Sequence, residues 1–275
     1  MKKLAVLGPK GTYSDIAAKK YISDNNIDAQ IEYYPSILKT ALALEESDLA
    51  ILPFENTLDG FVIESLDIII SHGFKITDQI KLDIDFAFVS NSNDIKDVKE
   101  VFCQFKAYGQ CIDFISKYGF NIIQTQSNSE TVKKINSANK NFGAIIPTHF
   151  LNEYNYNTVI EHVADRKKNE TRFFIVSKEN TLNIEYNDII NASLVIVIKE
   201  DKPGVLFSIL KELNELDINM NSIMSRPMKT EMGQYKFYIE ISLSKDSLNK
   251  LEKLNKELKK QGFFVEILGV YNKLN

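Results

Sequence analysis

Residues 169–176 read Asn-Glu-Thr-Arg-Phe-Phe-Ile-Val, and this segment ends a long alternation of apolar strands and amphipathic helices. The apolar run that begins at Phe173 is typical of a buried strand. Side chains alternate across a strand, so we expect Thr171 and Phe173 to share one face and Arg172 to lie on the other. Thr171 is therefore the first candidate for a functional residue. Arg172 is the second, because it reaches the same pocket only through an irregular backbone or from the rim.

The chain before this segment contains two sets of alternating elements. The predicted strands and helices are, in order, strand 4–7, helix 14–22, strand 31–34, helix 37–44, strand 49–53, helix 60–71, then strand 86–89, helix 109–118, strand 121–125, helix 130–137 and strand 143–146. Such alternation predicts an α/β fold with parallel-type sheets and helical crossovers. We expect two lobes, with residues 75–83 crossing between them and strand 172–176 returning to the first. Ligands of open α/β sheets bind beyond the carboxyl ends of strands, so a cleft between the lobes is the expected site.

The C-terminal part of the chain has a different pattern. Residues 178–191 are polar and rich in Asn, which predicts a linker. The predicted elements that follow are strand 193–199, helix 204–216, strand 219–225, a turn that contains Gly233, strand 235–243, helix 247–261 and strand 263–270. The order βαββαβ predicts a ferredoxin-like sandwich.

Composition excludes several classes of function. The 275 residues are 44% hydrophobic and 25% charged, which is typical of a globular chain of about two domains. A net charge of -4 gives no electrostatic basis for binding nucleic acid or an anionic membrane. The apolar run Leu4–Leu7 is too short for a signal peptide, and we expect a cytoplasmic protein. Cys103, Cys111 and three scattered histidines form no metal-ligand pattern, so we expect no metal.

Two earlier junctions between a strand and a helix carry polar residues. Gly8-Pro9-Lys10-Gly11-Thr12-Tyr13-Ser14 offers two glycines and two hydroxyls, which suit either an N-capped turn or a ligand loop. In Pro53-Phe54-Glu55-Asn56-Thr57-Leu58-Asp59-Gly60, the side chain of Asn56 either caps the next helix or turns toward a ligand. From the residues alone, the cap is the stronger reading for Asn56, and Cys111 is read as a buried small apolar residue.

Taken in order, these segments resemble the prephenate dehydratase family. The family's patterns are Gly-Pro-x-Gly-Thr-aromatic-Ser, Pro-x-Glu-Asn-Ser/Thr-x-x-Gly and Asp-x-x-x-Asn-x-Thr-Arg-Phe, matched by residues 8–14, 53–60 and 165–173. The C-terminal part resembles an ACT domain through Pro203-Gly204-Val205-Leu206 and through Ile218-Asn219-Met220-Asn221-Ser222-Ile223-Met224-Ser225-Arg226-Pro227. The resemblance covers nearly the whole chain.

The resemblance implies a domain organisation. We expect a two-lobed domain like the type II periplasmic binding proteins over 1–180, with lobe one at about 1–78 plus 160–180 and lobe two at about 79–159. A linker at 181–191 and an ACT domain at 192–275 follow. ACT domains of this family pair side by side, so the resemblance implies a homodimer or a dimer of dimers.

The resemblance also implies conversion of prephenate to phenylpyruvate, without a cofactor, in phenylalanine biosynthesis. The family's acid maps to Thr171, and the implied substrate-binding residues are Asn56, Gln110, Arg172, Ser127, Thr12, Gly11 and Phe173. The implied residues for a phenylalanine effector are Gly204, Val205, Leu206, Asn219, Ser225, Arg226 and Pro227. A carboxylate substrate suits these groups, since Arg172 can bind it bidentately and the amides can donate to it.

Three departures from the family pattern bear on these roles. The family's His-Pro-Gln-Ala is replaced by Gln104-Phe105-Lys106-Ala107, and its Ser-Thr-Ala-Glu-Ala by Ser127-Asn128-Ser129-Glu130-Thr131. Met224 stands where the family has an acidic residue before Ser-Arg-Pro. Two alternatives to prephenate dehydration stay open, namely the same elimination on arogenate and a non-catalytic carboxylate sensor that kept the fold.

Overall fold

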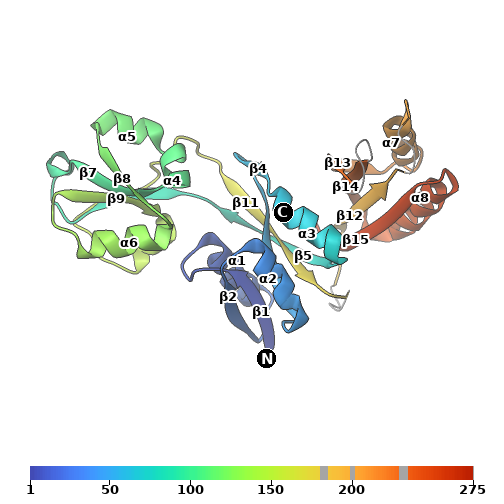
Figure 1. Ribbon diagram of the computed structural model, residues 1–275, viewed down its shortest axis with the longest axis horizontal. Helices are drawn as coiled ribbons and strands as arrows, with labels where there is room; N and C mark the ends of the chain where they lie inside the picture. Colours follow the sequence, from blue (N-terminus) through green and yellow to red (C-terminus); the bar gives the residue numbers. More distant parts are fainter. Residues whose placement is uncertain (180–184, 199–201, 229–234, 275) are drawn as a thin grey trace.

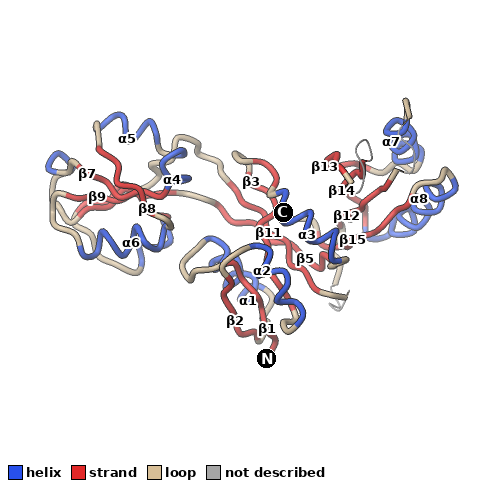
Figure 2. The backbone as a smooth tube through the Cα atoms, in the orientation of Figure 1, coloured by secondary structure: helices blue, strands red, loops and turns tan. Residues whose placement is uncertain are grey.

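The computed structural model describes residues 1–179, 185–198, 202–228 and 235–274. Within them the chain is a mixed α/β protein with three sheets, and its outline is elongated (Figure 1). A first lobe, drawn in blue and cyan, lies between a second lobe in green and a C-terminal unit in orange and red. The second lobe projects from the first on a few extended segments, which Figure 2 shows as a strand-rich neck.

The first lobe is built on a sheet with the order β2-β1-β3-β11-β5, to which β4 adds beside β3. Its strands are β1 (Lys2–Leu7), β2 (Ala29–Tyr34), β3 (Leu49–Asn56), β4 (Gly60–Phe61), β5 (Lys75–Asp83) and β11 (Glu170–Ser177). Its helices are α1 (Tyr13–Asp24), α2 (Ile37–Leu42) with the 3-10 turn η1 (Ala43–Glu45), and α3 (Ile63–His72). The return of the strand near residue 172 to this lobe is confirmed, because β11 lies between β3 and β5.

The second lobe has a sheet with the order β10-β6-β9-β7-β8. Its strands are β6 (Phe86–Ser90), β7 (Glu100–Gln104), β8 (Asn121–Thr125), β9 (Phe142–Pro147) and β10 (Thr158–Ile160). Its helices are α4 (Phe105–Gln110), α5 (Ile112–Tyr118) and α6 (Asn128–Ser137), with the 3-10 turns η2 (Ile95–Asp97) and η3 (Thr148–Asn152).

The expectation of parallel-type sheets is right for only part of each lobe. β1 pairs in parallel with β2 and β3, and β7 pairs in parallel with β8 and β9. β11 is antiparallel to both β3 and β5, while β6 is antiparallel to β9 and β10. The antiparallel strands are those that join the lobes, since a chain that leaves the first lobe along β5 and returns along β11 must reverse its direction.

Several elements differ from the sequence prediction. The helix expected at 60–71 begins only at Ile63, because Gly60 and Phe61 pair with β3 instead. The helix expected at 109–118 is two helices that meet at Cys111, and the first of them begins at Phe105. β7 and β10 were not predicted, since each is a short run without a clear alternation.

The C-terminal unit has the element order βαββαβ that the sequence predicted, and its described strands form a sheet of order β13-β14-β12-β15. Its strands are β12 (Ile189–Val197), β13 (Asn219–Pro227), β14 (Tyr235–Ser244) and β15 (Phe264–Asn272). Its helices are α7 (Val205–Glu215) and α8 (Leu248–Lys260), with the 3-10 turn η4 (Lys245–Ser247). Part of the predicted linker, Lys199 and the turn with Gly233 lie outside the described residues.

The three parts share apolar cores. One core joins α1 and β1 to β6, β7 and α4 through side chains of β5 and β11, such as Ile80 and Phe173. A second core joins β3 and α3 of the first lobe to β12, β14 and β15, and it includes Phe54, Tyr238 and Tyr271. Because both cores run through β5 and β11, these two strands hold the lobes and the C-terminal unit together.

The backbone of β15 approaches the first lobe closely at Gly269. A Cβ atom at this position would lie 1.9 Å from the carbonyl oxygen of Ile76 in β5. The obstacle is backbone, so it cannot turn aside as a side chain does. Only a residue without a side chain allows this approach.

We predict that Gly269→Ala lowers the free energy of unfolding by about 2 kcal/mol or more, because β15 must move away from β5. Gly109→Ala is the matched control, since a Cβ there meets nothing within 4 Å and lies in α4. This control should change stability by about 1 kcal/mol or less. Denaturant unfolding measures both, and equal stability of the two variants would contradict the close approach.

Candidate functional site

Thr171 of β11 and Asn56 of β3 lie directly opposite each other in the first lobe's sheet. The Asn56 Nδ2 donates a hydrogen bond to the Thr171 Oγ1 over 2.9 Å. The register of β3 against β11 shifts between Arg172 and Phe173, and Phe54 is the extra residue on β3. Bulges of this kind aim a side chain in a chosen direction, and here the bulge lies two residues before Asn56.

The hydrogen bonds of Asn56 fix its amide. Its Oδ1 accepts from the backbone N–H groups of Leu58 at 2.9 Å and Asp59 at 3.0 Å, which closes the turn after β3. The predicted alternative of a helix cap is wrong in detail, because α3 begins at Ile63 and Asn56 closes a turn instead. The Nδ2 must then face Thr171. Thr171 therefore accepts from Asn56 and keeps its own O–H to donate elsewhere.

Gln110, at the end of α4 in the second lobe, joins this group through Asn169. The Asn169 Oδ1 accepts from Asn56 Nδ2 at 2.8 Å, and the Asn169 Nδ2 donates to the Gln110 Oε1 at 2.8 Å. Asn169 itself is 4% exposed. Three predicted residues, Thr171, Asn56 and Gln110, are thus brought together by a fourth that the prediction did not include.

Asp165, in the segment between β10 and β11, supports Gln110. Its backbone N–H donates to the Gln110 carbonyl oxygen at 2.7 Å. Its carboxylate accepts from the backbone N–H groups of Ile112 at 3.0 Å and Asp113 at 3.1 Å, so it caps α5. This cap explains why the helix breaks at Cys111, directly after Gln110.

Arg172 does not point toward Thr171, so the structure does not bring this predicted substrate-binding residue to the site. Its Nη1 donates to both carboxylate oxygens of Glu240 in β14, at 2.9 and 2.8 Å. Its Nη2 donates to Glu55 at 2.8 Å. The physical reason is the alternation of side chains along β11, which turns Arg172 to the face that the C-terminal unit covers.

The Arg172–Glu240 pair is largely buried, with 15% of the Arg172 side chain and 3% of the Glu240 side chain exposed. The guanidinium carbon lies 5.0 Å from the ring centre of Phe54 and 5.4 Å from that of Phe174. Burial alone would lower the pKa of Arg172, but the carboxylate of Glu240 outweighs it and the pKa is raised. Glu240 is 2% exposed and also accepts from the Tyr271 hydroxyl at 2.9 Å. This pair is a charged link between the strand that carries Thr171 and the C-terminal unit.

Gly11 and Thr12 lie where the first lobe meets the second. The Gly11 N–H donates to Asp15 at 2.8 Å, and the Thr12 hydroxyl caps α1. A Cβ at Gly11, whose φ is +87°, would lie 2.9 Å from Phe150 and 3.0 Å from Ser129 of the second lobe. The Ser129 hydroxyl also donates to the Lys10 carbonyl oxygen at 3.0 Å. The loop that carries Gly11 therefore packs closely against the second lobe.

Ser127 acts in the structure as the N-cap of α6. Its hydroxyl accepts from the Glu130 N–H at 3.1 Å, and the Glu130 carboxylate accepts from the Gln126 N–H at 2.7 Å. This is a capping box, in which the two side chains satisfy each other's free backbone groups. Among the described residues no hydrogen bond joins Ser127, Gly11 or Thr12 to Thr171. Phe173 is 1% exposed and belongs to the core that joins the lobes.

Two other reactive groups are buried. Burial raises the pKa of the Cys111 thiol, which disfavours a nucleophilic thiolate and agrees with its prediction as a packing residue. Burial lowers the pKa of His149 to about 4, so this imidazole is neutral near pH 7. The described residues contain no group of three His, Cys, Asp or Glu side chains placed as metal ligands. They also contain no helix long and apolar enough to cross a membrane.

The site therefore consists of a hydroxyl and three amides where the two lobes meet, and a comparison with known proteins decides the family. A family model described as prephenate dehydratase matches residues 4–181. A prephenate dehydratase of Methanocaldococcus jannaschii is 33% identical over 265 residues, which cover 96% of this chain and 95% of the relative. The chain belongs to the prephenate dehydratase family.

Solved structures agree with the membership. A prephenate dehydratase from Staphylococcus aureus superposes with a TM-score of 0.85 at 28% identity, covering 99% of this chain and 100% of that one. One from Arthrobacter aurescens, described in complex with L-Phe, has a TM-score of 0.78 at 22% identity and covers 98% of this chain and 90% of that one. The latter shows a shared fold.

The first departure from the family pattern has a structural explanation. Gln104, in the place of the family's His, caps α4 by accepting from the N–H groups of Lys106 at 2.7 Å and Ala107 at 3.3 Å. The Lys106 Nζ lies 3.6 Å from the Asp59 carboxylate, so an exposed ion pair joins the second lobe to the turn after Asn56. The departure alters the rim beside the site and leaves the Gln110 position intact.

The residues that the family resemblance implied for an effector lie on two elements of the C-terminal unit. Gly204 begins α7 with φ of +90°, followed by Val205 and the partly exposed Leu206, while Asn219, Ser225, Arg226 and Pro227 lie on β13. Arg226 is engaged inside this chain, since its Nη2 donates to Asp67 of α3 at 2.7 Å. Met224 packs against the core that joins the C-terminal unit to the first lobe, which accounts for an apolar residue there.

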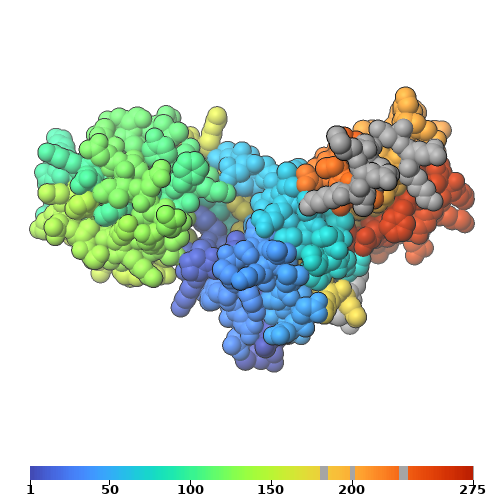
Figure 3. Space-filling model, in the orientation of Figure 1, coloured from blue at the N-terminus to red at the C-terminus, as the bar shows by residue number. Residues whose placement is uncertain are grey.

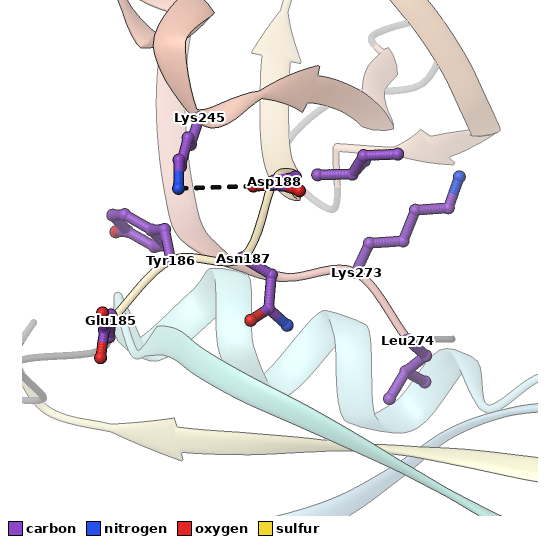
Figure 4. A pocket seen from close by; sticks show the side chains of 8 residues that line it. Glu185, Tyr186, Asn187, Asp188, Lys245, Lys273 and Leu274 are labelled. Carbon is purple, nitrogen blue, oxygen red and sulfur yellow. Dashed lines mark ion pairs between the residues drawn. The ribbon is translucent and has the colours of Figure 1, made fainter.

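A surface depression lies away from the Thr171 group (Figure 4). It has a volume of about 680 Å³ and is lined by Glu185, Tyr186, Asn187, Asp188, Ile189, Lys245, Lys273 and Leu274. It lies at the ends of β12 and β15, and one ion pair, Lys245–Asp188 at 3.4 Å, crosses it. No residue of the Thr171 group lines it. Figure 3 shows a recess between the green second lobe and the blue and cyan first lobe, and the hydrogen bonds of Asn169 to Asn56 and to Gln110 join these two lobes.

Sequence reasoning missed two residues that shape this site. Asn169 is part of the family pattern at 165–173, but it was not among the predicted site residues. Glu240 carries no motif, but it is a charged residue inside the apolar strand predicted at 235–243. A charge in such a run is a signal for a buried partner, because burying an unpaired carboxylate is costly.

We predict that Glu240→Gln lowers the free energy of unfolding by about 3 kcal/mol, because it leaves a buried guanidinium without its main partner. The matched control is Glu266→Gln, which removes an interdomain pair with Lys75 whose side chains are 29% and 30% exposed. Glu266→Gln should lower the free energy of unfolding by about 1 kcal/mol or less. Denaturant unfolding compares them, and a Glu240 variant as stable as the control would contradict the burial of this pair.

Proposed function

We propose that this protein is a prephenate dehydratase in which Thr171 protonates the departing hydroxyl group. One observation carries the proposal: Asn56 donates to the Thr171 oxygen, and its own orientation is fixed by two backbone N–H groups. The threonine proton is therefore free to point at a ligand. Membership in the family supports prephenate as the substrate, and the hydrogen bond from Asn56 supports the role of Thr171 as the proton donor.

The reaction balances without an electron acceptor. The bond between the ring and its carboxylate breaks and releases carbon dioxide, and its electron pair forms the new ring double bond as the ring hydroxyl leaves. That hydroxyl takes a proton and departs as water, which leaves phenylpyruvate. A threonine hydroxyl is a weak acid, so Thr171 acts chiefly by a strong hydrogen bond to the leaving oxygen, and solvent restores its proton.

The amides have separate tasks in this scheme. Asn56 positions Thr171, because its Nδ2 donates to Asn169 Oδ1, to the Glu170 carbonyl oxygen and to Thr171, while its Oδ1 accepts from two backbone N–H groups. Gln110 uses its Oε1 for Asn169, and among the described residues its Nε2 has no hydrogen-bond partner. We assign the Gln110 Nε2 to a substrate carboxylate. Gly11, Thr12 and Ser127 shape the wall of the recess between the lobes.

We further propose that residues 1–180 form two lobes of the type II periplasmic-binding-protein kind, and that residues 192–275 form a ferredoxin-like ACT domain which binds phenylalanine. The L-Phe described with the Arthrobacter aurescens protein supports this ligand. The βαββαβ order of the C-terminal unit supports the domain assignment. Pairing of two ACT domains would complete the effector site, so we propose a homodimer or a larger assembly.

Regulation then has a physical route. Glu240 lies on β14 of the C-terminal unit and holds Arg172, the residue that follows Thr171 on β11. A change in the position of β14 therefore pulls on the strand that carries the catalytic hydroxyl. Arg226 and Asp67 form a second link from β13 to α3.

We predict that Thr171→Ala lowers kcat for prephenate by roughly 100- to 10,000-fold with a smaller change in KM, since it removes the proton donor. Thr171→Ser keeps the hydroxyl and should retain most of the rate. Thr158→Ala is the matched control, a strand threonine of the second lobe whose hydroxyl bonds to the Ser92 carbonyl oxygen. Spectrophotometric detection of phenylpyruvate measures all three.

Full activity of Thr171→Ala would refute the role of the hydroxyl. The same assay of the unmodified protein with arogenate tests the substrate, because arogenate yields phenylalanine instead of phenylpyruvate. Faster turnover of arogenate would make it the better substrate. Absence of turnover with either would contradict dehydration and leave a binding protein.

We predict that phenylalanine binds the protein, measured by calorimetry, and slows prephenate turnover. If Arg172–Glu240 carries the effect, Glu240→Gln should keep phenylalanine binding and lose most of the inhibition. Glu266→Gln should keep both. An unchanged rate with bound phenylalanine in the unmodified protein would contradict coupling, and absence of binding would contradict the effector site.

A further inference from the structure

Asn169 touches site residues from both lobes. It lies directly before β11 and is 4% exposed. Its Oδ1 accepts from Asn56 at 2.8 Å and from the Thr57 hydroxyl at 3.3 Å, both from the end of β3. Its Nδ2 donates to Gln110 of the second lobe at 2.8 Å. Its own carbonyl oxygen accepts from the Ile84 N–H at 2.7 Å, which fixes the backbone.

The orientation of each amide in this chain follows from the one before it. Two backbone N–H groups, which cannot change roles, hold the Asn56 Oδ1 and so turn its Nδ2 to Asn169. Asn169 must then present its Oδ1 to Asn56 and its Nδ2 to the second lobe. Gln110 must accept this hydrogen bond with its Oε1. The Gln110 Nε2 is consequently left as the group available to a ligand.

We propose that Asn169 is a positioning residue that selects which end of the Gln110 amide faces the substrate. This inference rests on the proposed dehydration of prephenate. A donor facing the recess attracts a substrate carboxylate, whereas an acceptor in the same place repels it. Asn169 does not touch the substrate itself. Through Asn169, the orientation of Asn56 in the turn after β3 determines the orientation of the Gln110 amide at the end of α4.

Asn169→Asp separates the hydrogen bonds that Asn169 accepts from the one that it donates. The new carboxylate still accepts from Asn56 and Thr57, so the orientation of Asn56 toward Thr171 is retained. It has no donor for Gln110, whose amide must turn its Nε2 to the carboxylate and its Oε1 to the recess. We expect kcat/KM for prephenate to fall roughly 10- to 100-fold, mostly through a higher KM, because a donor to a charged group is lost.

A double-mutant cycle with Gln110→Ala tests the route. If Asn169 acts through Gln110, Asn169→Asp lowers kcat/KM in the unmodified background and has little further effect once the Gln110 amide is gone. An equal loss in both backgrounds would overturn the proposal and leave Asn169 as a structural residue. Asn157→Asp is the matched control, a loop asparagine of the second lobe bonded to the Asn91 carbonyl oxygen, and it should leave kcat/KM unchanged.

Gln110→Glu provides a second, independent test if Asn169→Asp fails to fold. One carboxylate oxygen still accepts from Asn169, and the other replaces the Nε2 that faces the recess. KM should rise by at least as much as in Asn169→Asp. An unchanged KM would show that the Nε2 does not face the substrate, and the proposal would fall.

The proposed dehydration and the positioning role of Asn169 can be refuted by different results. If the unmodified protein turns over neither prephenate nor arogenate, the proposed function fails. If it is active and Asn169→Asp matches it in kcat and KM, the positioning role alone fails. Thermal unfolding of each variant confirms that the compared proteins are folded.

Discussion

The alternation of side chains along β11 is the constraint on which the rest of this structure depends. Thr171 and Arg172 are neighbours in sequence, yet the strand turns them to opposite faces of one sheet. Thr171 joins the amides where the lobes meet, and Arg172 enters the core shared with the C-terminal unit. One strand therefore carries a candidate catalytic group on one face and an interdomain ion pair on the other.

The burial of that ion pair gives it more weight than its surface counterparts. Glu240 is 2% exposed and the Arg172 guanidinium lies against two aromatic rings, so solvent does not screen their attraction. The Lys106–Asp59 pair, by contrast, is exposed and screened by solvent, and pairs of this kind contribute little to stability. Removal of one partner from the buried pair is therefore expected to cost more stability than removal of one partner from the exposed pair.

Much of this arrangement could be predicted from the sequence, and the misses have physical causes. Apolar periodicity predicted most elements, including the βαββαβ order, and strand alternation correctly separated Thr171 from Arg172. Periodicity could not predict that β5 and β11 are antiparallel, because strand direction depends on how the chain crosses between lobes. Arg172 was assigned to the substrate, whereas its guanidinium binds Glu240, a residue 68 positions away that carries no motif.

The amide chain was beyond prediction for a different reason. Asn56 had two readings from sequence, a helix cap or a ligand group, and the structure gives a third, a turn that fixes the amide toward Thr171. Asn169 was visible in the family pattern, but its contacts come from residues 113 and 59 positions away. Long-range hydrogen bonds of this kind leave no local signal.

A crystal structure with a saturated-ring analogue of prephenate would test the central claim most directly, because the analogue keeps the ring hydroxyl and both carboxylates but cannot become aromatic. The account predicts the analogue's hydroxyl oxygen at hydrogen-bond distance from the Thr171 Oγ1, about 2.6–3.2 Å. It also predicts that Arg172 stays on Glu240. A structure with the Arg172 guanidinium on a ligand carboxylate, and the hydroxyl away from Thr171, would contradict it.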